Sequence, residues 1–318
     1  MRVLITGAAG FVGRHLATHL LTLGGDDVWG LVRRVDVEPR LDPRLRLTVA
    51  DLLEPEQVAP ALAETRPEAI YHLAGLSSVA SSLGSPLQFL VDNVACQVNL
   101  LEAVAGSGLD PRILIIGSSE EYGLTQPDEL PITETKELRP ISPYAVSKVT
   151  QDLLGHQYFA TRGLKIVRVR PFTHTGPGQS HTFVTASFAR QIADMELRSR
   201  EPVLRVGLLQ GQRDFTDVRD VARGYRLILA GGEPGQVYNL GSERPRSIES
   251  VLNGLVELSA VRPRVEVDQS LVRPLEVPAH YADCSRLRAA TGWQPEIPFD
   301  QTLADVLDDW RHRVRTKH

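Results

Sequence analysis

Tyr144 and Lys148 lie four residues apart in the sequence, and their side chains could carry out acid–base chemistry. Residues i and i+4 share one face of an α-helix, so the phenol and the ammonium are expected to reach the same space. A neighbouring ammonium favours the phenolate and lowers a phenol pKa that starts at about 10. Tyr144 is therefore a candidate proton donor to a carbonyl oxygen. Ser142 and Pro143 are typical of an N-cap and a first helical residue, so we expect a helix to begin there.

The same spacing also occurs in ordinary surface pairs, so the interpretation depends on a glycine-rich segment near the N-terminus. A strand-like run, 2–6, and a helix-period run, 11–23, flank this segment. Its glycines would allow a tight turn, close approach of backbone N–H groups to a pyrophosphate, and packing of the helix on the strand. As a plain strand–helix turn it would need no ligand, but its place at the first strand favours a dinucleotide. The residues concerned are Gly7, Gly10, Phe11, Val12 and Gly13.

Arg33 and Arg34 follow a second predicted strand, 27–32, about 20 residues after Gly13. Arginine at this place suits a ribose 2′-phosphate. NADP(H) is therefore favoured over NAD(H), an alternative that Asp36 leaves open. Further cofactor contacts are expected where later strands end, at Asp51, Leu52, Leu73, Ala74, Gly75 and Pro171.

Strands alternate with helices as far as residue 172, which predicts an α/β fold with a doubly wound parallel sheet. We expect a Rossmann-like domain at 1–172 and a smaller mixed substrate lobe at 173–318, with some segments returning to the sheet. Ser118 and Glu120 follow the β-branched run 113–116. Ligands collect at this carboxyl edge of open parallel sheets.

The composition is that of a soluble globular protein: 318 residues, 42% hydrophobic and 23% charged. A net charge of −4 argues against a nucleic-acid partner. The two cysteines lack CxxC spacing, and no Cys/His cluster suggests a metal site. No signal peptide and no apolar run of ~18 residues is found, so we expect a cytoplasmic protein without a membrane partner.

Taken together, these residues resemble the extended short-chain dehydrogenase/reductase family that acts on nucleotide sugars. The matching segments are collinear and span nearly the whole chain. Within the family the chain is most similar to GDP-4-keto-6-deoxy-D-mannose reductases. The segments are T-G-A-A-G-F-V-G (6–13), H-L-A-G (72–75), S-S-E-E-Y-G (118–123), S-P-Y-A-V-S-K (142–148), R-P-F (170–172), R-D-F-T-D-V-R-D (213–220) and R-P-L-E-V-P (273–278).

The resemblance implies a role for each matching residue. Ser118 would bind the sugar oxygen at C4, Tyr144 would protonate it, and Lys148 would hold the nicotinamide ribose and tune Tyr144. Arg213 and Arg273 would contact the diphosphate or ribose. The other implied substrate contacts are Glu276 at guanine, Val184, and Thr173, where many relatives have asparagine.

The resulting hypothesis is NADPH-dependent reduction of the C4 ketone of GDP-4-keto-6-deoxy-D-mannose to GDP-D-rhamnose. The first alternative is a GDP-mannose 4,6-dehydratase, in which Glu120 would remove the C5 proton. The second is a non-catalytic, nucleotide-sensing Rossmann protein. The resemblance also implies a homodimer, formed by the helices around 86–106 and Tyr144.

Overall fold

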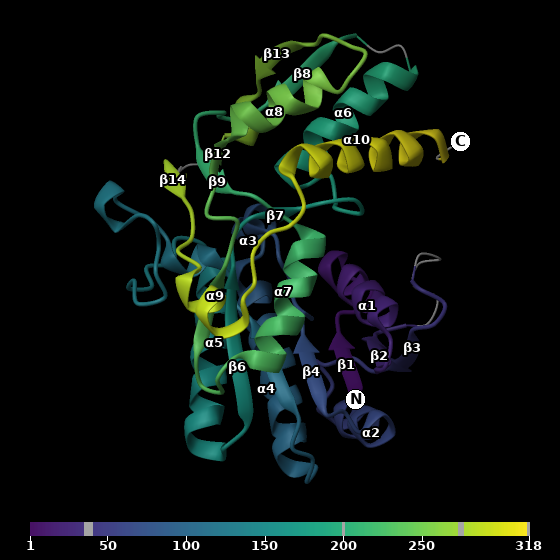
Figure 1. Ribbon diagram of the computed structural model, residues 1–318, viewed down its shortest axis with the longest axis vertical. Helices are drawn as coiled ribbons and strands as arrows, with labels where there is room; N and C mark the ends of the chain where they lie inside the picture. The colour runs from purple at the N-terminus through teal and green to yellow at the C-terminus, as the bar shows by residue number, and fades with distance from the viewer. Residues whose placement is uncertain (35–40, 199–200, 273–276, 317–318) are drawn as a thin grey trace.

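A seven-stranded parallel sheet forms the centre of the computed structural model, which describes residues 1–34, 41–198, 201–272 and 277–316 (Figure 1). The strand order is β11-β6-β5-β4-β1-β2-β3, so the doubly wound α/β sheet expected from the sequence is confirmed. The strands are β1 (Arg2–Thr6), β2 (Asp27–Val32), β3 (Arg46–Val49), β4 (Ala69–His72), β5 (Arg112–Ile116), β6 (Lys165–Pro171) and β11 (Val237–Leu240).

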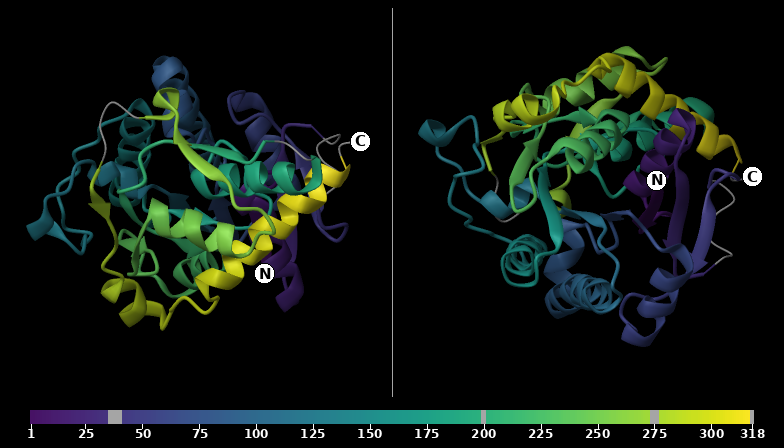
Figure 2. Two further views of the ribbon diagram at one scale, coloured as in Figure 1. Left: turned by 90° about the horizontal axis from the view of Figure 1, so that it is seen from above. Right: turned by 60° about the horizontal axis from the view of Figure 1, so that its bottom comes forward.

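Helices cover both faces of this sheet, because its central strands carry apolar side chains on both sides. In β1, Val3 and Ile5 pack into one core while Leu4 packs into the other, as the two-residue period of a strand requires. The first core contains α1 (Phe11–Leu23) and α7 (Val218–Gly231). The second contains α2 (Pro55–Thr65), α4 (Pro86–Gly106) and α5 (Pro143–Arg162), the last two seen nearly end on in the right panel of Figure 2.

A smaller lobe lies above the carboxyl edge of the sheet (Figures 1 and 2). Three of its helices share a hydrophobic core with the strand β8 (Val203–Val206). The helices are α6 (Val184–Arg198), α8 (Ile248–Glu257) and α10 (Phe299–Thr316). The remaining strands are β7 (His174–Thr175), β9 (Gln212–Asp214), β10 (Thr216–Asp217), β12 (Pro245–Ser247), β13 (Arg264–Val267) and β14 (Ala279–His280).

The chain crosses between the two parts more than once after residue 172. Strand β11 pairs with β6 in the main sheet, and α7 packs beside α1. Short helices lie elsewhere, at α3 (Val79–Gly84), α9 (Ser285–Thr291) and the 3₁₀ turn η1 (Ser119–Tyr122). None of the helices within the described ranges is long and apolar enough to cross a membrane.

Candidate active site

The glycine segment forms a tight turn between β1 and α1, in which Gly7 and Gly13 have no room for a side chain. Gly7 has a positive φ of 66°, and a Cβ there would lie 2.9 Å from the backbone nitrogen of Ala74. A Cβ on Gly13 would collide with the carbonyl oxygen of Gly7. Gly10 is the N-cap of α1 and offers no side chain to its N–H groups. The N-terminus of α1 is thus accessible to a pyrophosphate, so these residues fit a dinucleotide.

The other expected cofactor residues follow strands of the same sheet edge. Arg33 and Arg34 are exposed just after β2, and Pro171 ends β6. The segment after β4 adjoins the glycine turn, because the Ala74 N–H donates to Thr6 Oγ1 at 3.1 Å. Asp36 lies outside the described residues. The remaining members, Asp51, Leu52, Leu73 and Gly75, follow β3 and β4.

Ser118, Tyr144 and Lys148 come together below the smaller lobe, although they come from two separate segments. Ser118 follows β5 and caps η1, whereas Tyr144 and Lys148 lie in the first two turns of α5. That helix begins as expected, with Pro143 in its first turn and the Ser142 hydroxyl accepting from Ala145 N–H at 3.1 Å. The Ser118 side chain lies near enough to Tyr144 to favour its phenolate. All three catalytic candidates are buried.

The expected lowering of the Tyr144 pKa by Lys148 is wrong for this structure. Burial raises the pKa of Tyr144 above its ordinary value, because the phenolate loses solvation; the nearby Ser118 side chain opposes this. Lys148 Nζ donates instead to Ile116 O at 2.9 Å and to Gln151 Oε1 at 2.8 Å. Spacing alone could not reveal this desolvation. A protonated phenol is nevertheless the form that can give a proton to a substrate oxygen.

Two adjacent carboxylates at this site have different environments. Glu120 is half-buried, and its charge acts to raise the pKa of Tyr144. Glu121 is fully buried and was not among the site residues expected from the sequence. Its Oε1 accepts from Ser118 N–H at 2.6 Å, and its Oε2 accepts from Arg170 Nε at 3.0 Å. Arg170 also pairs with Asp152 at 2.5 Å, so Glu121 fixes Ser118 to a buried charge cluster.

The substrate candidates that can be described lie in the smaller lobe above Ser118. Thr173 O accepts from Thr216 N–H at 2.9 Å, Val184 begins α6, and Arg213 Nη1 donates to Val277 O at 2.7 Å. Arg273 and Glu276 lie outside the described residues. His280 was not among the residues expected from the sequence. Its buried side chain lies on β14 opposite Arg213, and its Nε2 atom lies 3.0 Å from Ser119 O.

Comparison with known proteins places this geometry in a family. The family described as GDP-mannose 4,6 dehydratase matches residues 4–306. The chain belongs to this family. A GDP-6-deoxy-D-mannose reductase of Pseudomonas aeruginosa is 36% identical over 99% of this chain and 98% of its own length. GDP-mannose 4,6 dehydratase 2 of Arabidopsis thaliana is 30% identical over 96% and 86%.

Solved structures of related enzymes share the whole fold. RMD from Pseudomonas aeruginosa, complexed with NADPH, superposes with a TM-score of 0.86 at 34% identity and covers 98% of this chain and 100% of its own. The UDP-glucose 4-epimerase of Thermus thermophilus, complexed with NAD, gives a TM-score of 0.86 at 28% identity over 98% and 99%. The chain is thus an NAD(P)-dependent oxidoreductase of the short-chain dehydrogenase/reductase type, with NADP(H) as its cofactor.

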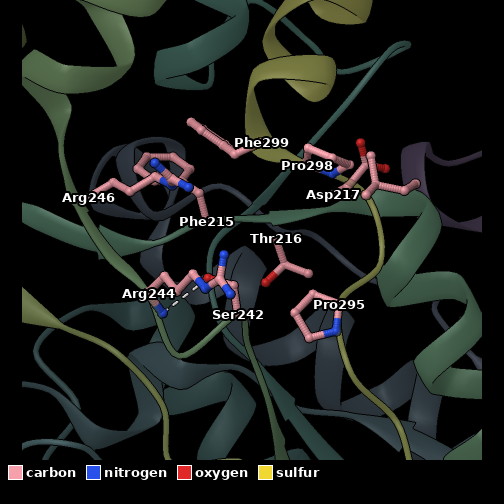
Figure 3. Close-up of a pocket in the computed structure, with 10 residues that line it drawn as sticks. Phe215, Thr216, Asp217, Ser242, Arg244, Arg246, Pro295, Pro298 and Phe299 are labelled. Atoms are coloured by element: carbon pink, nitrogen blue, oxygen red, sulfur yellow. Dashed lines mark hydrogen bonds between the residues drawn. The ribbon is translucent and has the colours of Figure 1, made fainter.

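A separate cavity of about 170 Å³ lies in the smaller lobe of this family member (Figure 3). It lies where β10, the loop before β12 and the chain before α10 meet, and none of the expected site residues lines it. Its walls include Phe215, Thr216, Asp217, Arg244, Arg246 and Phe299. This cavity is therefore no part of the site formed by Ser118, Tyr144 and Lys148.

Proposed function

We propose that the chain reduces the C4 ketone of GDP-4-keto-6-deoxy-D-mannose with NADPH and releases GDP-D-rhamnose. The observation that carries the proposal is that Ser118 and Tyr144 lie buried and close together beside the carboxyl edge of the sheet, where the Ser118 side chain acts on the phenol of Tyr144. The similarity to a GDP-6-deoxy-D-mannose reductase over 99% of the chain supports the substrate class.

Each residue of the site has one task in this proposal. When bound, NADPH supplies the hydride that C4 of the sugar receives. The glycine turn holds the pyrophosphate, Arg33 and Arg34 bind the 2′-phosphate, and Lys148 binds the nicotinamide ribose. Ser118 donates a hydrogen bond to the ketone oxygen, and Tyr144 transfers its phenolic proton to that oxygen as the alcohol forms. Asp51, Leu52, Leu73, Ala74, Gly75 and Pro171 complete the cofactor contacts.

The GDP end of the substrate would be bound by the smaller lobe. We assign the diphosphate to Arg213 and Arg273, because planar guanidinium groups bind phosphate oxygens in pairs. Glu276 would accept the N1–H and N2–H₂ donors of guanine. Thr173, just before β7, and Val184, at the start of α6, would contact the sugar and the nucleotide.

A 4,6-dehydratase is the rival activity, supported by the family's description and by the carboxylate of Glu120 near Tyr144. The two activities differ in their demand for reductant. Incubation with GDP-mannose alone should leave the sugar unchanged. Incubation with the GDP-4-keto-6-deoxy sugar and NADPH should consume the keto sugar and the NADPH together. If a 4-keto product forms from GDP-mannose without added reductant, the enzyme is a dehydratase and the reductase proposal is wrong. If neither mixture shows turnover, a nucleotide-sensing protein is favoured.

We also propose that two copies pair through α4 and α5, in the cytoplasm. These adjacent helices expose large apolar side chains, including Leu87 (70% exposed), Val91 (51%), Val146 (40%) and Leu153 (55%). Large apolar side chains exposed on two neighbouring helices are typical of a subunit interface. The thiols of Cys96 and Cys284 are free, as expected in a reducing compartment.

A further inference from the structure

The ammonium of Lys148 is held by Gln151, a residue to which no role was assigned above. An ammonium has three N–H donors. Two of them are used by the carbonyl oxygen of Ile116, at 2.9 Å, and by Gln151 Oε1, at 2.8 Å. Among the described residues the third N–H has no acceptor, so the two acceptors determine the direction in which it points.

The side-chain amide of Gln151 can lie in only one orientation. Its Nε2 donates to the carbonyl oxygen of Asn93 in α4 at 2.9 Å. A carbonyl oxygen only accepts and an ammonium only donates, so Oε1 must face Lys148. Gln97 of α4 donates in turn to the backbone oxygen of Gln151 at 2.7 Å. Both glutamine side chains are at most 1% exposed.

The same contacts connect Lys148 to helix α4 and to the loop after β4. Asn93 bonds Ser147 Oγ at 2.9 Å and both polar backbone groups of Leu76, which follows the segment at Gly75. Ser147 Oγ donates to Tyr144 O at 2.7 Å. One buried hydrogen-bond network therefore joins α4, the loop after β4 and the two catalytic candidates of α5.

We propose that Gln151 is a positioning residue that orients the Lys148 ammonium toward the nicotinamide ribose and keeps it charged. The proposal rests on the proposed role of Lys148 as the ribose contact. Gln151 is suited to this task because it is the one type of neutral side chain of this length that accepts from an ammonium while donating to a carbonyl.

The charge of Lys148 depends on the ionisable groups packed around it. Burial lowers the pKa of Lys148 to about 8, and negative charge on Glu121 of η1 opposes this. Burial also raises the pKa of Glu121 itself well above its ordinary value. His72 on β4 is neutral at such pH, because burial lowers its pKa to about 3. Tyr144, on the same helix, is protonated. Arg170 of β6 and Asp152 of α5 pair with each other, and Arg170 also pairs with Glu121.

The test measures the Kd of NADPH by its fluorescence between pH 6 and 9.5, without any sugar substrate. In Gln151→Met the ammonium loses an acceptor, so the pH at which binding weakens should fall by about one unit. In Gln151→Glu the added carboxylate should raise that pH by a similar amount. At pH 8 the methionine variant should bind NADPH about fivefold more weakly than the wild type, approaching tenfold at pH 9.5, and at pH 6 less than threefold.

Two further variants separate positioning from helix packing. Gln97→Met removes a buried hydrogen bond between the same helices but touches no atom of Lys148. Gln157→Met alters an exposed glutamine of α5 that bonds Thr161. Both should keep the wild-type pH dependence, even where Gln97→Met lowers the Tm.

The proposal is overturned if Gln151→Met and Gln151→Glu move the pH dependence in the same direction or not at all while both stay folded by circular dichroism. It is also overturned if Gln97→Met produces the same shift as Gln151→Met. Because NADPH binding alone is measured, these results are independent of the sugar that the enzyme reduces. A failure of the proposed reductase activity would appear only in the turnover assays.

Discussion

Replacing Glu121 should destabilise the fold far more than replacing its neighbour Glu120. In Glu121→Gln the amide oxygen can still accept from Ser118 N–H, but the amide nitrogen cannot accept from Arg170 Nε. The variant therefore loses one charge-assisted hydrogen bond, of 3.0 Å, in a fully buried place. Such bonds contribute about 1.5–3 kcal/mol. Arg170 keeps Asp152 as its partner, so the loss should stay within this range.

Glu121→Leu adds a second loss, because the buried Ser118 N–H then has no acceptor. An unsatisfied buried donor costs about 1–3 kcal/mol more, which gives a total of about 3–6 kcal/mol. Glu120→Gln is the matched control: among the described contacts its carboxylate makes no hydrogen bond or ion pair, so the change should stay within about 0.5 kcal/mol.

Urea unfolding followed by circular dichroism gives the free energy of unfolding for each variant, and thermal scans should show a Tm fall of about 3–10 °C for Glu121→Gln. Equal stability of the Glu120 and Glu121 variants would refute the reasoning. It would mean that the contacts of Glu121 with Ser118 and Arg170 contribute nothing to stability.

The other predictions test the proton donor, the cofactor turn and the subunit interface. Tyr144→Phe should lower kcat by about 10²–10⁴-fold and leave the NADPH Kd within about threefold of the wild type; stopped-flow and fluorescence titration measure the two, and near-normal kcat would exclude Tyr144 as the donor. Gly13→Ala should weaken NADPH binding by at least about tenfold, because a Cβ would collide with Gly7 O; unchanged titration would contradict this. Leu153→Glu places a charge on the exposed apolar face of α5, so light scattering should report a monomer where the wild type is a dimer. If the wild type is itself a monomer, the proposed interface between two copies is wrong.

The elements that position the site could be predicted because their signals are local. The glycine turn predicted the start of α1, Ser142 and Pro143 predicted the start of α5, and the runs 2–6 and 113–116 predicted β1 and β5. Strands of two or three residues, such as β7 and β10, were not predicted, because they are too short to show a periodicity. Their pairing depends on contacts between distant segments.

The site itself was only partly predictable. The expected ammonium effect on Tyr144 followed from spacing, but burial depends on the packing of η1 and α5 and reversed its sign. Glu121 and Gln151 did have local signals: Glu121 completes the S-x-x-E pattern of a capping box, and Gln151 lies three residues after Lys148 on the same helix face. His280 had none, because its contact with Ser119 joins residues 161 positions apart.

The most direct test of the central claim uses NADPH deuterated at its hydride-donating carbon, mixed with enzyme and GDP-4-keto-6-deoxy-D-mannose. The account predicts that NMR finds the deuterium at C4 of GDP-D-rhamnose, with one NADPH consumed for each sugar reduced. Deuterium that stays on the coenzyme while the sugar is transformed, or a reduced product without label at C4, would contradict it.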